Sequence, residues 1–406
     1  MRILGIETSC DETAVAIVED GRKILSNIVV SQIDIFAAYG GVIPEIAARS
    51  HLEAMMPAVH QAFQVAGFTL PDPTPSSTPT SPNSTSSPIP TLPNLTPNST
   101  QLSQTENTPL ADWSKIDAIA VTHTPGLLGS LLIGTLTART LAILHHKPLF
   151  PIHHLKSHIY ANWLNSSNIQ FPLLALVVSG GHTQIIHMQQ HNHFEIIGTT
   201  RDDAVGECFD KIAKILGLPY PGGPAITQAA NGKITQSNLT TLSTPPGNPL
   251  KYPFPHPQVP GLDFSFSGLK TAVLRTVQAE LHKPLSFPSH QLAPLLSKTQ
   301  IADFAASFQQ TAVDILIEKL TLALKHYPET KSLIIAGGVS ANQTLRQTAQ
   351  STFSHPPFSL PVFFPAPEFS GDNAAMVGSA AFYEIKSGIQ PTDPYHLNLA
   401  PRSAIF

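Results

Sequence analysis

The chain has 406 residues, more than one ordinary hydrophobic core holds, and this length favours two domains. Lys and Arg total 23 against 27 Asp and Glu, and the net charge of -4 excludes a strongly basic nucleic-acid-binding surface, so any RNA contact is local or shared with partners. Only two cysteines are present, which excludes a disulfide framework and favours a reduced, cytoplasmic setting, and the polar N-terminus offers no apolar run long enough for a signal peptide.

The first elements expected along the chain form a β-hairpin. Apolar runs at residues 2–6 and 14–18 flank a polar turn at residues 7–13, which could face a ligand. Residues 71–112 follow, and 27 of these 42 positions are Pro, Ser or Thr, with no Lys or Arg. Such a composition cannot bury enough apolar area to offset its ordering entropy, so we expect a disordered insert, the alternative being a segment that orders on a partner.

A strand is then expected at residues 116–121, leading into a helix within the apolar window 126–144. Polar residues interrupt that window, which favours a buried helix over a membrane span. A second hairpin is expected from residues 171–178 and 183–187, which flank the turn Ser179-Gly180-Gly181-His182. A helix at residues 202–216 ends at Gly217, and the strand at residues 333–336 again leads through a glycine loop into a helix.

The hairpin-led pattern therefore occurs twice, as in the class of actin, hexokinase and Hsp70, where two such turns face each other across a nucleotide cleft. We expect an α/β chain with a two-lobed actin-like fold, duplicated domains and an inter-lobe cleft. The expected boundaries are an N-terminal lobe at 1–70 and 113–150, the insert at 71–112, a C-terminal lobe at 151–386, and a tail at 387–406 that packs back on the N-terminal lobe.

Two histidines stand at helical spacing in the middle of the chain. His154 and His158 are four residues apart, and Leu155 and Ile159 suit the apolar side of a helix, so both imidazoles share a face that can bind one divalent metal. In a chain with 18 histidines the pair can also be a coincidence. No Glu follows His154, so the His-Glu-x-x-His arrangement of zinc proteases is missing.

The acidic residues and the glycine loops each allow a structural and a functional interpretation. Asp203, Glu207 and Lys211 stand four apart on the expected helix, which is typical of a solvated face with modest ion pairs. Asp372 is expected to open a helix at 372–386, as an N-cap or first-turn acid, or to complete a two-His-one-carboxylate metal face. Glycine pairs at 180–181, 222–223 and 337–338 permit turns or let the backbone approach a bound phosphate or ribose; all three lie in the loops that end expected strands or helices.

Taken together, these segments resemble one family, the tRNA N6-adenosine threonylcarbamoyltransferases (TsaD family), formerly described as O-sialoglycoprotein endopeptidases. The resemblance spans nearly the whole chain outside residues 71–112. The ordered segments that carry it are IETSCDET at 6–13, HLKSH at 154–158, VSGGHT at 178–183, DDAVGE at 202–207, FDK at 209–211, YPGGP at 220–224, DFSFSGLKT at 263–271 and GGVSAN at 337–342.

The resemblance implies an actin-like transferase that moves a threonylcarbamoyl group from threonylcarbamoyl-AMP to N6 of adenosine 37 in tRNAs that read codons beginning with A, releasing AMP. It further implies a divalent metal, iron in preference to zinc, and a cleft that also suits an ATP-like nucleotide. Its site residues correspond here to metal ligands His154, His158 and Asp372, to substrate contacts Val177, Val178, Ser179, Gly180, Gly181, Asp210, Gly223 and Asn342, and to catalytic acids Asp11 and Glu12.

The partners implied by the resemblance are the tRNA anticodon loop, a paralogous actin-like subunit of the TsaB type and a small ATPase of the TsaE type, with no membrane. An unpaired base of an anticodon loop can enter a pocket without the opening of a duplex. Departures from the family pattern are Thr124 before Pro125-Gly126, Thr227 where some relatives have a carboxylate, and Ser370-Gly371 before Asp372.

Three other functions compete with transfer to tRNA. A small-molecule kinase or ATPase would use the same cleft for ATP, and a phosphorylated product would favour it. A peptidase is disfavoured by the missing Glu beside His154. A non-catalytic scaffold subunit would leave tRNA modification intact after His158→Ala.

Overall fold

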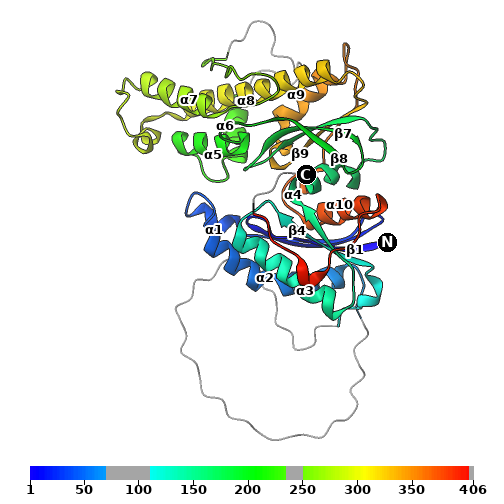
Figure 1. Cartoon of the computed structure of the whole chain (residues 1–406). Coiled ribbons are helices and arrows are strands. Elements are labelled where there is room, and N and C mark those ends of the chain that lie inside the picture. Colours follow the sequence, from blue (N-terminus) through cyan, green and yellow to red (C-terminus); the bar gives the residue numbers. More distant parts are fainter. Residues whose placement is uncertain (70–109, 235–249, 402–406) are drawn as a thin grey trace, which may run out of the picture.

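The computed structural model describes residues 1–69, 110–234 and 250–401 (Figure 1). The insert expected at 71–112 therefore lies outside the described residues except for its last three positions. Within the described ranges, no helix combines the length and the apolarity that crossing a bilayer requires.

The first sheet contains the first predicted hairpin. β1 (Arg2–Glu7) pairs antiparallel with β2 (Glu12–Glu19), which pairs antiparallel with β3 (Lys23–Ser31). β1 also pairs in parallel with β4 (Ala118–Thr124), beyond which lies β5 (Leu149–His153). The order is β3-β2-β1-β4-β5, so the turn after β1 lies at the carboxyl end of a central strand.

Helices cover both faces of this sheet, which explains why its central strands are apolar at nearly every position. α2 (Pro44–Val65) and α3 (Leu128–Leu144) pack on one face, near the short α1 (Ile33–Ala37). α10 (Ala374–Lys386) packs on the other, against β1 and β2 (Figure 1). The expected helix at 126–144 is α3, but the expectation that it is buried holds for one side only, because Leu128, Leu132 and Leu136 are exposed.

The second sheet repeats the topology of the first. β6 (Leu173–Val178) pairs antiparallel with β7 (Thr183–Gln190), β7 with β8 (His193–Thr199), and β6 pairs in parallel with β9 (Ser332–Ala336). With the short β10 (Val362–Phe363) the order is β10-β9-β6-β7-β8. The strands correspond one by one to those of the first sheet, and the predicted duplication of hairpin-led α/β units is confirmed.

The helices of the second half pack around one large apolar cluster centred on α8 (Lys298–His326). α8 begins with a capping box in which Ser297 and Gln300 satisfy each other's backbone N–H groups. The other helices of this half are α5 (Val205–Leu216), α6 (Gly222–Ile234), α7 (Ser267–Glu280) and α9 (Gln343–Phe353). Single 3₁₀ turns occur at Trp113–Lys115, Ala161–Leu164, Ser289–Gln291, Ala293–Leu295, Gly338–Ala341, Pro367–Phe369 and Pro394–His396.

One apolar layer joins the two sheets. The short helix α4 (His154–Tyr160) and helix α10 lie between them, and a single cluster includes Ile3 of β1, Leu155 of α4, Met376 of α10 and Ile334 of β9. The expected C-terminal lobe ran to residue 386, yet α10 contacts the first sheet, so this helix belongs to the junction of the lobes. The tail also contacts the first lobe, where Leu397 is buried in its core.

Candidate metal centre and glycine loops

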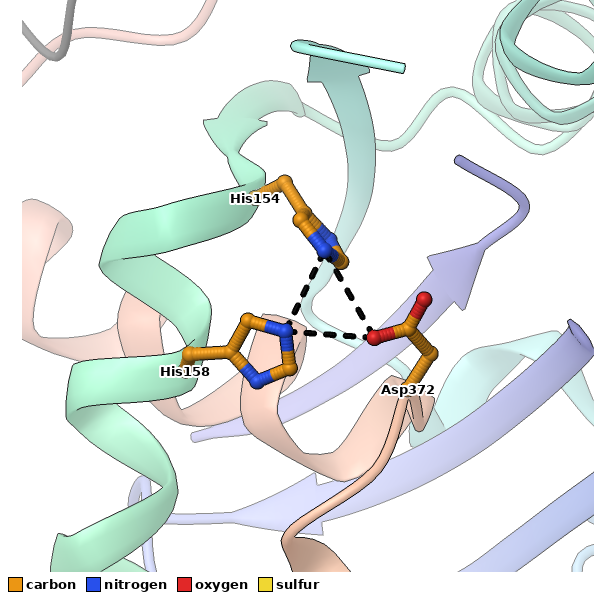
Figure 2. A group of neighbouring side chains, drawn as sticks. All are labelled: His154, His158 and Asp372. Atoms are coloured by element: carbon orange, nitrogen blue, oxygen red, sulfur yellow. Dashed lines mark hydrogen bonds and ion pairs between the residues drawn. The ribbon is translucent and has the colours of Figure 1, made fainter. Parts of the chain in front are cut away.

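The two histidines lie on α4, which begins immediately after β5. His153 caps the helix, because its Nδ1 accepts a hydrogen bond from the Leu155 backbone N–H at 3.2 Å. Leu155 and Ile159 turn into the apolar layer, so His154 and His158 share the opposite side, as their spacing predicted (Figure 2). Both imidazoles are buried.

Asp372 meets both imidazoles from the segment that leads into α10 (Figure 2). Its Oδ1 lies 3.1 Å from His158 Nε2 and 3.5 Å from His154 Nε2, and the two Nε2 atoms are 3.2 Å apart. Ligand atoms held about 2.0–2.2 Å from one ion stand roughly 2.9–3.6 Å apart in tetrahedral or octahedral geometry. Two imidazoles and one carboxylate at these separations therefore fit a single divalent cation.

Asp372 is not the first residue of the helix. α10 begins at Ala374, and Asn373 caps it by accepting a hydrogen bond from the Met376 backbone N–H at 3.1 Å. The expectation of a helix that opens at 372 was wrong by two residues, because the amide of Asn373 fills the capping position. The carboxylate of Asp372 is thereby free to face α4.

The electrostatics of this triad favour a cation. Burial alone would lower the pKa of His154, but Asp372 and Glu7 raise it to about 9. Burial would likewise raise the pKa of Asp372, but His154 and His158 hold it at about 2. The negative charges that raise the pKa of His154 would also stabilise a bound divalent cation.

Glu7 was missed by the sequence reasoning, which read it only as part of a polar turn. Its side chain is fully buried at the end of β1. Glu7 Oε2 lies 3.1 Å from His154 Nδ1 and accepts a hydrogen bond from the Thr122 hydroxyl at 2.6 Å, while Oε1 accepts one from the Ser9 backbone N–H at 2.6 Å. The available signal was an acid that ends an otherwise apolar strand.

The acidic turn after β1 lies beside the triad. Burial, then Asp372 and Asp11, raise the pKa of Glu12 well above the ordinary range of a glutamate. Side chains of two helices contact the backbone of this turn. His51 Nε2 of α2 lies 3.0 Å from the Cys10 carbonyl oxygen, and the Ser130 hydroxyl of α3 donates to the same oxygen at 3.1 Å. The turn is therefore fixed at its backbone, and Glu12 is a carboxyl group that binds a proton unusually tightly.

Gly126→Ala tests how tightly this turn is packed. A Cβ at Gly126 would lie 2.6 Å from the Ser9 carbonyl oxygen, a backbone atom that also accepts the Leu127 N–H. We expect this substitution to lower the free energy of unfolding by about 1–3 kcal/mol through overpacking. Denaturant unfolding measures it. Gly268→Ala, in the first turn of α7, is the control, since an added Cβ there meets no atom within 4 Å and the backbone is not in the left-handed region. Equal effects of the two substitutions would contradict the close packing.

The second hairpin brings its own glycine turn to the same region. Val177 and Val178 end β6 and are buried, and Ser179, Gly180 and Gly181 form the turn that follows. A Cβ at either glycine would meet no atom within 4 Å, so this backbone faces open space. A neighbour of this turn is His182, whose pKa falls to about 4 because of burial and the repulsion of His154 and His158.

Asp210 and Gly223 lie on the neighbouring helices α5 and α6. Asp210 Oδ1 accepts the Gly222 backbone N–H at 2.7 Å, and Gly223 has open space where a Cβ would stand. Burial, then Glu207 and Asp11, raise the pKa of Asp210, so the acidic turn of the first lobe acts electrostatically on this helix of the second. On the same helix, Lys211 pairs with Glu207 at 2.8 Å, which confirms one expected i, i+4 contact. Lys211 also pairs at 2.7 Å with Asp203, which is eight residues away and precedes α5, because the helix expected from residue 202 begins at Val205.

Asn342 lies farther into the second lobe, where it caps α9. Its amide donates to Thr227 Oγ1 at 3.1 Å and to Gln309 Oε1 at 2.9 Å. Thr227, which stands where some relatives carry a carboxylate, thus keeps a polar partner for Asn342. Within the described part of the chain, the side-chain hydrogen bonds of Asn342 reach α6, α8 and α9, and none of them reaches the triad.

Arg346 connects the third glycine loop to the segment before Asp372. Its Nε donates to the Ser340 carbonyl oxygen at 2.6 Å, and its Nη2 donates to the Pro365 carbonyl oxygen at 2.8 Å and to Ser370 Oγ at 3.1 Å. Ser370, one of the departures from the family pattern, therefore serves as a partner of this guanidinium. Loop 337–342 and the lead-in to Asp372 are held together by one side chain.

The fold and the site define a class of protein: a duplicated actin-like α/β chain with a two-His-one-carboxylate triad at the junction of its lobes. A model of the family described as TsaD, tRNA N6-adenosine threonylcarbamoyltransferase, matches residues 23–74 and 104–379. The chain belongs to this family.

Similar proteins agree with this assignment. Two proteins named tRNA N6-adenosine threonylcarbamoyltransferase are similar over nearly their full length: one from Symbiobacterium thermophilum is 40% identical over 96% of this chain and 93% of its own, and one from Crocosphaera subtropica is 42% identical over 95% and 93%. Among solved structures, HypF of T. kodakarensis is similar in fold, with a TM-score of 0.52 at 12% identity over 95% of this chain and 48% of its own.

Proposed function

We propose that this chain transfers the threonylcarbamoyl group from threonylcarbamoyl-AMP to N6 of adenosine 37 in tRNAs reading codons that begin with A, with release of AMP. Membership of the family supports the reaction class. The observation that carries the proposal is the meeting of a tightly proton-binding Glu12 with the His154–His158–Asp372 triad, beside loops whose backbone faces open space. This neighbourhood offers both a proton acceptor and a polarising site for a carbamoyl group. We also propose that the chain works in the cytoplasm, where its tRNA substrate is found.

We propose that His154, His158 and Asp372 hold one divalent metal, iron in preference to zinc. When bound, such an ion polarises a carbonyl or holds a carboxylate of the substrate. Asp372 is about one-fifth exposed, so the triad is open on the carboxylate side while both imidazoles remain buried. The two-His-one-carboxylate set leaves coordination positions for substrate, and carboxylate with imidazole suits iron as well as zinc.

We propose that Glu12 accepts the proton that leaves the adenine amine when the new N–C bond forms and AMP departs with the electrons of the broken acyl–phosphate bond. Asp11 orients the amine or shares this role. An exocyclic amine is a poor nucleophile, and a base beside it typically contributes ~10²- to 10⁴-fold. On the other side, Val177, Val178, Ser179, Gly180, Gly181, Asp210, Gly223 and Asn342 hold the adenylate, and an ATP-like nucleotide would occupy the same loops.

The test of the reaction uses threonylcarbamoyl-AMP, an unmodified substrate tRNA and the purified chain with its partners. We expect threonylcarbamoyladenosine in the digested tRNA, and its loss in tRNA from cells depleted of the chain. A phosphorylated small molecule formed from ATP without tRNA would instead favour the kinase reading, and unchanged modification after His158→Ala would favour a scaffold.

We propose as partners the tRNA anticodon loop, a paralogous actin-like subunit of the TsaB type and a small ATPase of the TsaE type. An apolar face on the first lobe supports the paralogous subunit. Leu52 of α2 and Leu128, Leu132 and Leu136 of α3 are exposed, and α3 repeats them every fourth residue. A patch of exposed apolar side chains on two packed helices is typical of a protein–protein interaction surface.

Leu132→Glu is expected to break this association. A charge in the middle of an apolar interface costs several-fold to orders of magnitude in affinity because it stays unpaired on burial. Co-purification of the chain with the co-expressed paralogue measures it. Leu285→Glu is the control, since Leu285 is an exposed leucine of the second lobe, 67% exposed against 40% for Leu132. If Leu132→Glu co-purified with the paralogue as wild type does, α3 would not be the docking face.

A further inference from the structure

Glu7 stands directly behind one of the two imidazoles of the triad. Its carboxylate is fully buried and has three polar partners: His154 Nδ1 at 3.1 Å, the Thr122 hydroxyl at 2.6 Å and the Ser9 N–H at 2.6 Å. Burying a carboxylate costs free energy unless hydrogen bonds and opposite charges offset the loss of hydration, and these three partners provide that compensation. The end of β1 is therefore built to present a negative charge to the ring of His154.

The placement of Glu7 fixes which nitrogen of His154 carries the proton. An ionised carboxylate is an acceptor only, so the nitrogen that faces it must be an N–H donor. His154 Nδ1 is that nitrogen, and in the neutral ring that a metal requires, the lone pair of Nε2 points to His158 and Asp372, 3.2 Å and 3.5 Å away. His158 differs, because its Nδ1 is buried without a hydrogen-bond partner in the described part of the chain.

We propose that Glu7 is a positioning residue that fixes the tautomer and ring orientation of His154 and strengthens its bond to the metal. This inference rests on the proposed metal centre. A carboxylate that accepts the far N–H of a ligating imidazole makes the ligand a better base, and removal of such a group typically costs ~10- to 100-fold in metal affinity. Within the described residues His154 has this support and His158 does not, so the two imidazoles contribute unequally.

Glu7→Gln tests the proposal, since it keeps the shape and removes the charge. Affinity for Zn²⁺ and Co²⁺ is measured on the full-length protein by competition with a chromophoric chelator, with the Co²⁺ absorption spectrum as a second readout. We expect the dissociation constants to rise ~10- to 100-fold and the spectrum to change. Glu384→Gln is the matched control, because Glu384 is also buried and ion-paired, to Lys156 of α4 at 3.4 Å, a residue that is not one of the proposed ligands.

Two further variants keep the proposal open to refutation if Glu7→Gln fails to fold. Thr122→Val removes a hydrogen bond from Glu7 while the carboxylate stays, and we expect a several-fold weaker affinity. Ser9→Ala removes the hydroxyl that lies 3.2 Å from the same Nδ1, and we expect an unchanged affinity if the carboxylate sets the tautomer.

The outcomes separate the two claims. A folded Glu7→Gln protein, or Thr122→Val where the former does not fold, that binds both metals as wild type does would overturn the positioning role and leave the metal centre standing. Failure of the wild-type chain to bind either metal would overturn both.

Discussion

Glu12→Gln is expected to lower the rate of threonylcarbamoyl transfer by ~10²- to 10⁴-fold, the range of a lost general base. The amide keeps the volume of the side chain but cannot take the proton from the adenine amine. The loss should fall on kcat rather than on KM for the adenylate, because the residues that we propose to hold the adenylate belong to the second lobe. Single-turnover transfer to tRNA, with adenylate supplied, measures it.

The pH dependence of transfer follows from the raised pKa of Glu12, for which burial and the charges of Asp372 and Asp11 are responsible. A base works in its deprotonated form, so the rate should rise with pH until Glu12 is ionised, at a pH well above the ordinary pKa of glutamate. A cation bound at Asp372 offsets part of that repulsion and shifts the rise to lower pH. Glu12→Gln should abolish the rise.

The same variant should be more stable than wild type in metal-free protein at neutral pH. A carboxyl whose folded pKa is raised stabilises the fold below its unfolded pKa and loses that contribution as pH rises through the folded pKa. Gln removes the cost of ionising the buried group, so the Tm should rise while activity falls. Glu195→Gln is the control for both measurements, because Glu195 is 64% exposed on β8, at the edge of the second sheet. Full activity of both Glu12→Gln and Asp11→Asn would remove the acidic turn from the mechanism.

Local sequence patterns predicted the parts of this site that one element contains. The spacing of His154 and His158 predicted a shared helix face, and apolar runs around residues 7–13 predicted a hairpin turn, because both depend on a period of the backbone. For Asp372 the sequence left a helix cap and a metal ligand both open, since its approach to α4 depends on how α10 packs, and the cap is made by Asn373 instead. The sequence shows Glu7 only as the end of a strand, because its partner Thr122 is brought beside it by the pairing of β1 with β4.

The position of α10 shows a second limit. Its buried residues lie on most sides of the helix, so no single stripe points to one sheet, and the sequence assigned it to the second lobe by chain order alone. In the structure it fills the layer between both sheets. Since α4 faces the same layer, residues that are far apart along the chain converge there without any local signal.

Asp372→Asn is expected to weaken metal binding by more than ~100-fold, above the range for loss of a group outside the coordination sphere. The amide retains the shape but loses the charge that balances a divalent cation between two imidazoles. Transfer activity should fall with metal content, and neither should recover at micromolar added metal. Metal analysis of purified protein and chelator competition measure the first effect. His187→Gln is the control. His187 is a buried histidine of β7 in the second sheet, away from the triad, and it also lies within 4 Å of two carboxylates, those of Glu195 and Glu329.

Metal-free Asp372→Asn protein should also show a loss of stability that depends on pH. With Asp372 present, the pKa of His154 is raised to about 9, so the protonated ring stabilises the fold fully below its unfolded pKa of roughly 6.5 and ceases to do so as pH rises through 9. The pKa of Asp372 is lowered to about 2, so its ionised carboxylate stabilises the fold above its unfolded pKa, and this stabilisation is lost as pH falls through 2. The substitution should therefore cost most between roughly pH 4 and 6.5 and least near pH 10, a difference that urea unfolding at the two ends of the range resolves. A loss of stability equal at both ends would mean that Asp372 acts through packing alone, because only its charge couples to the protonation of His154.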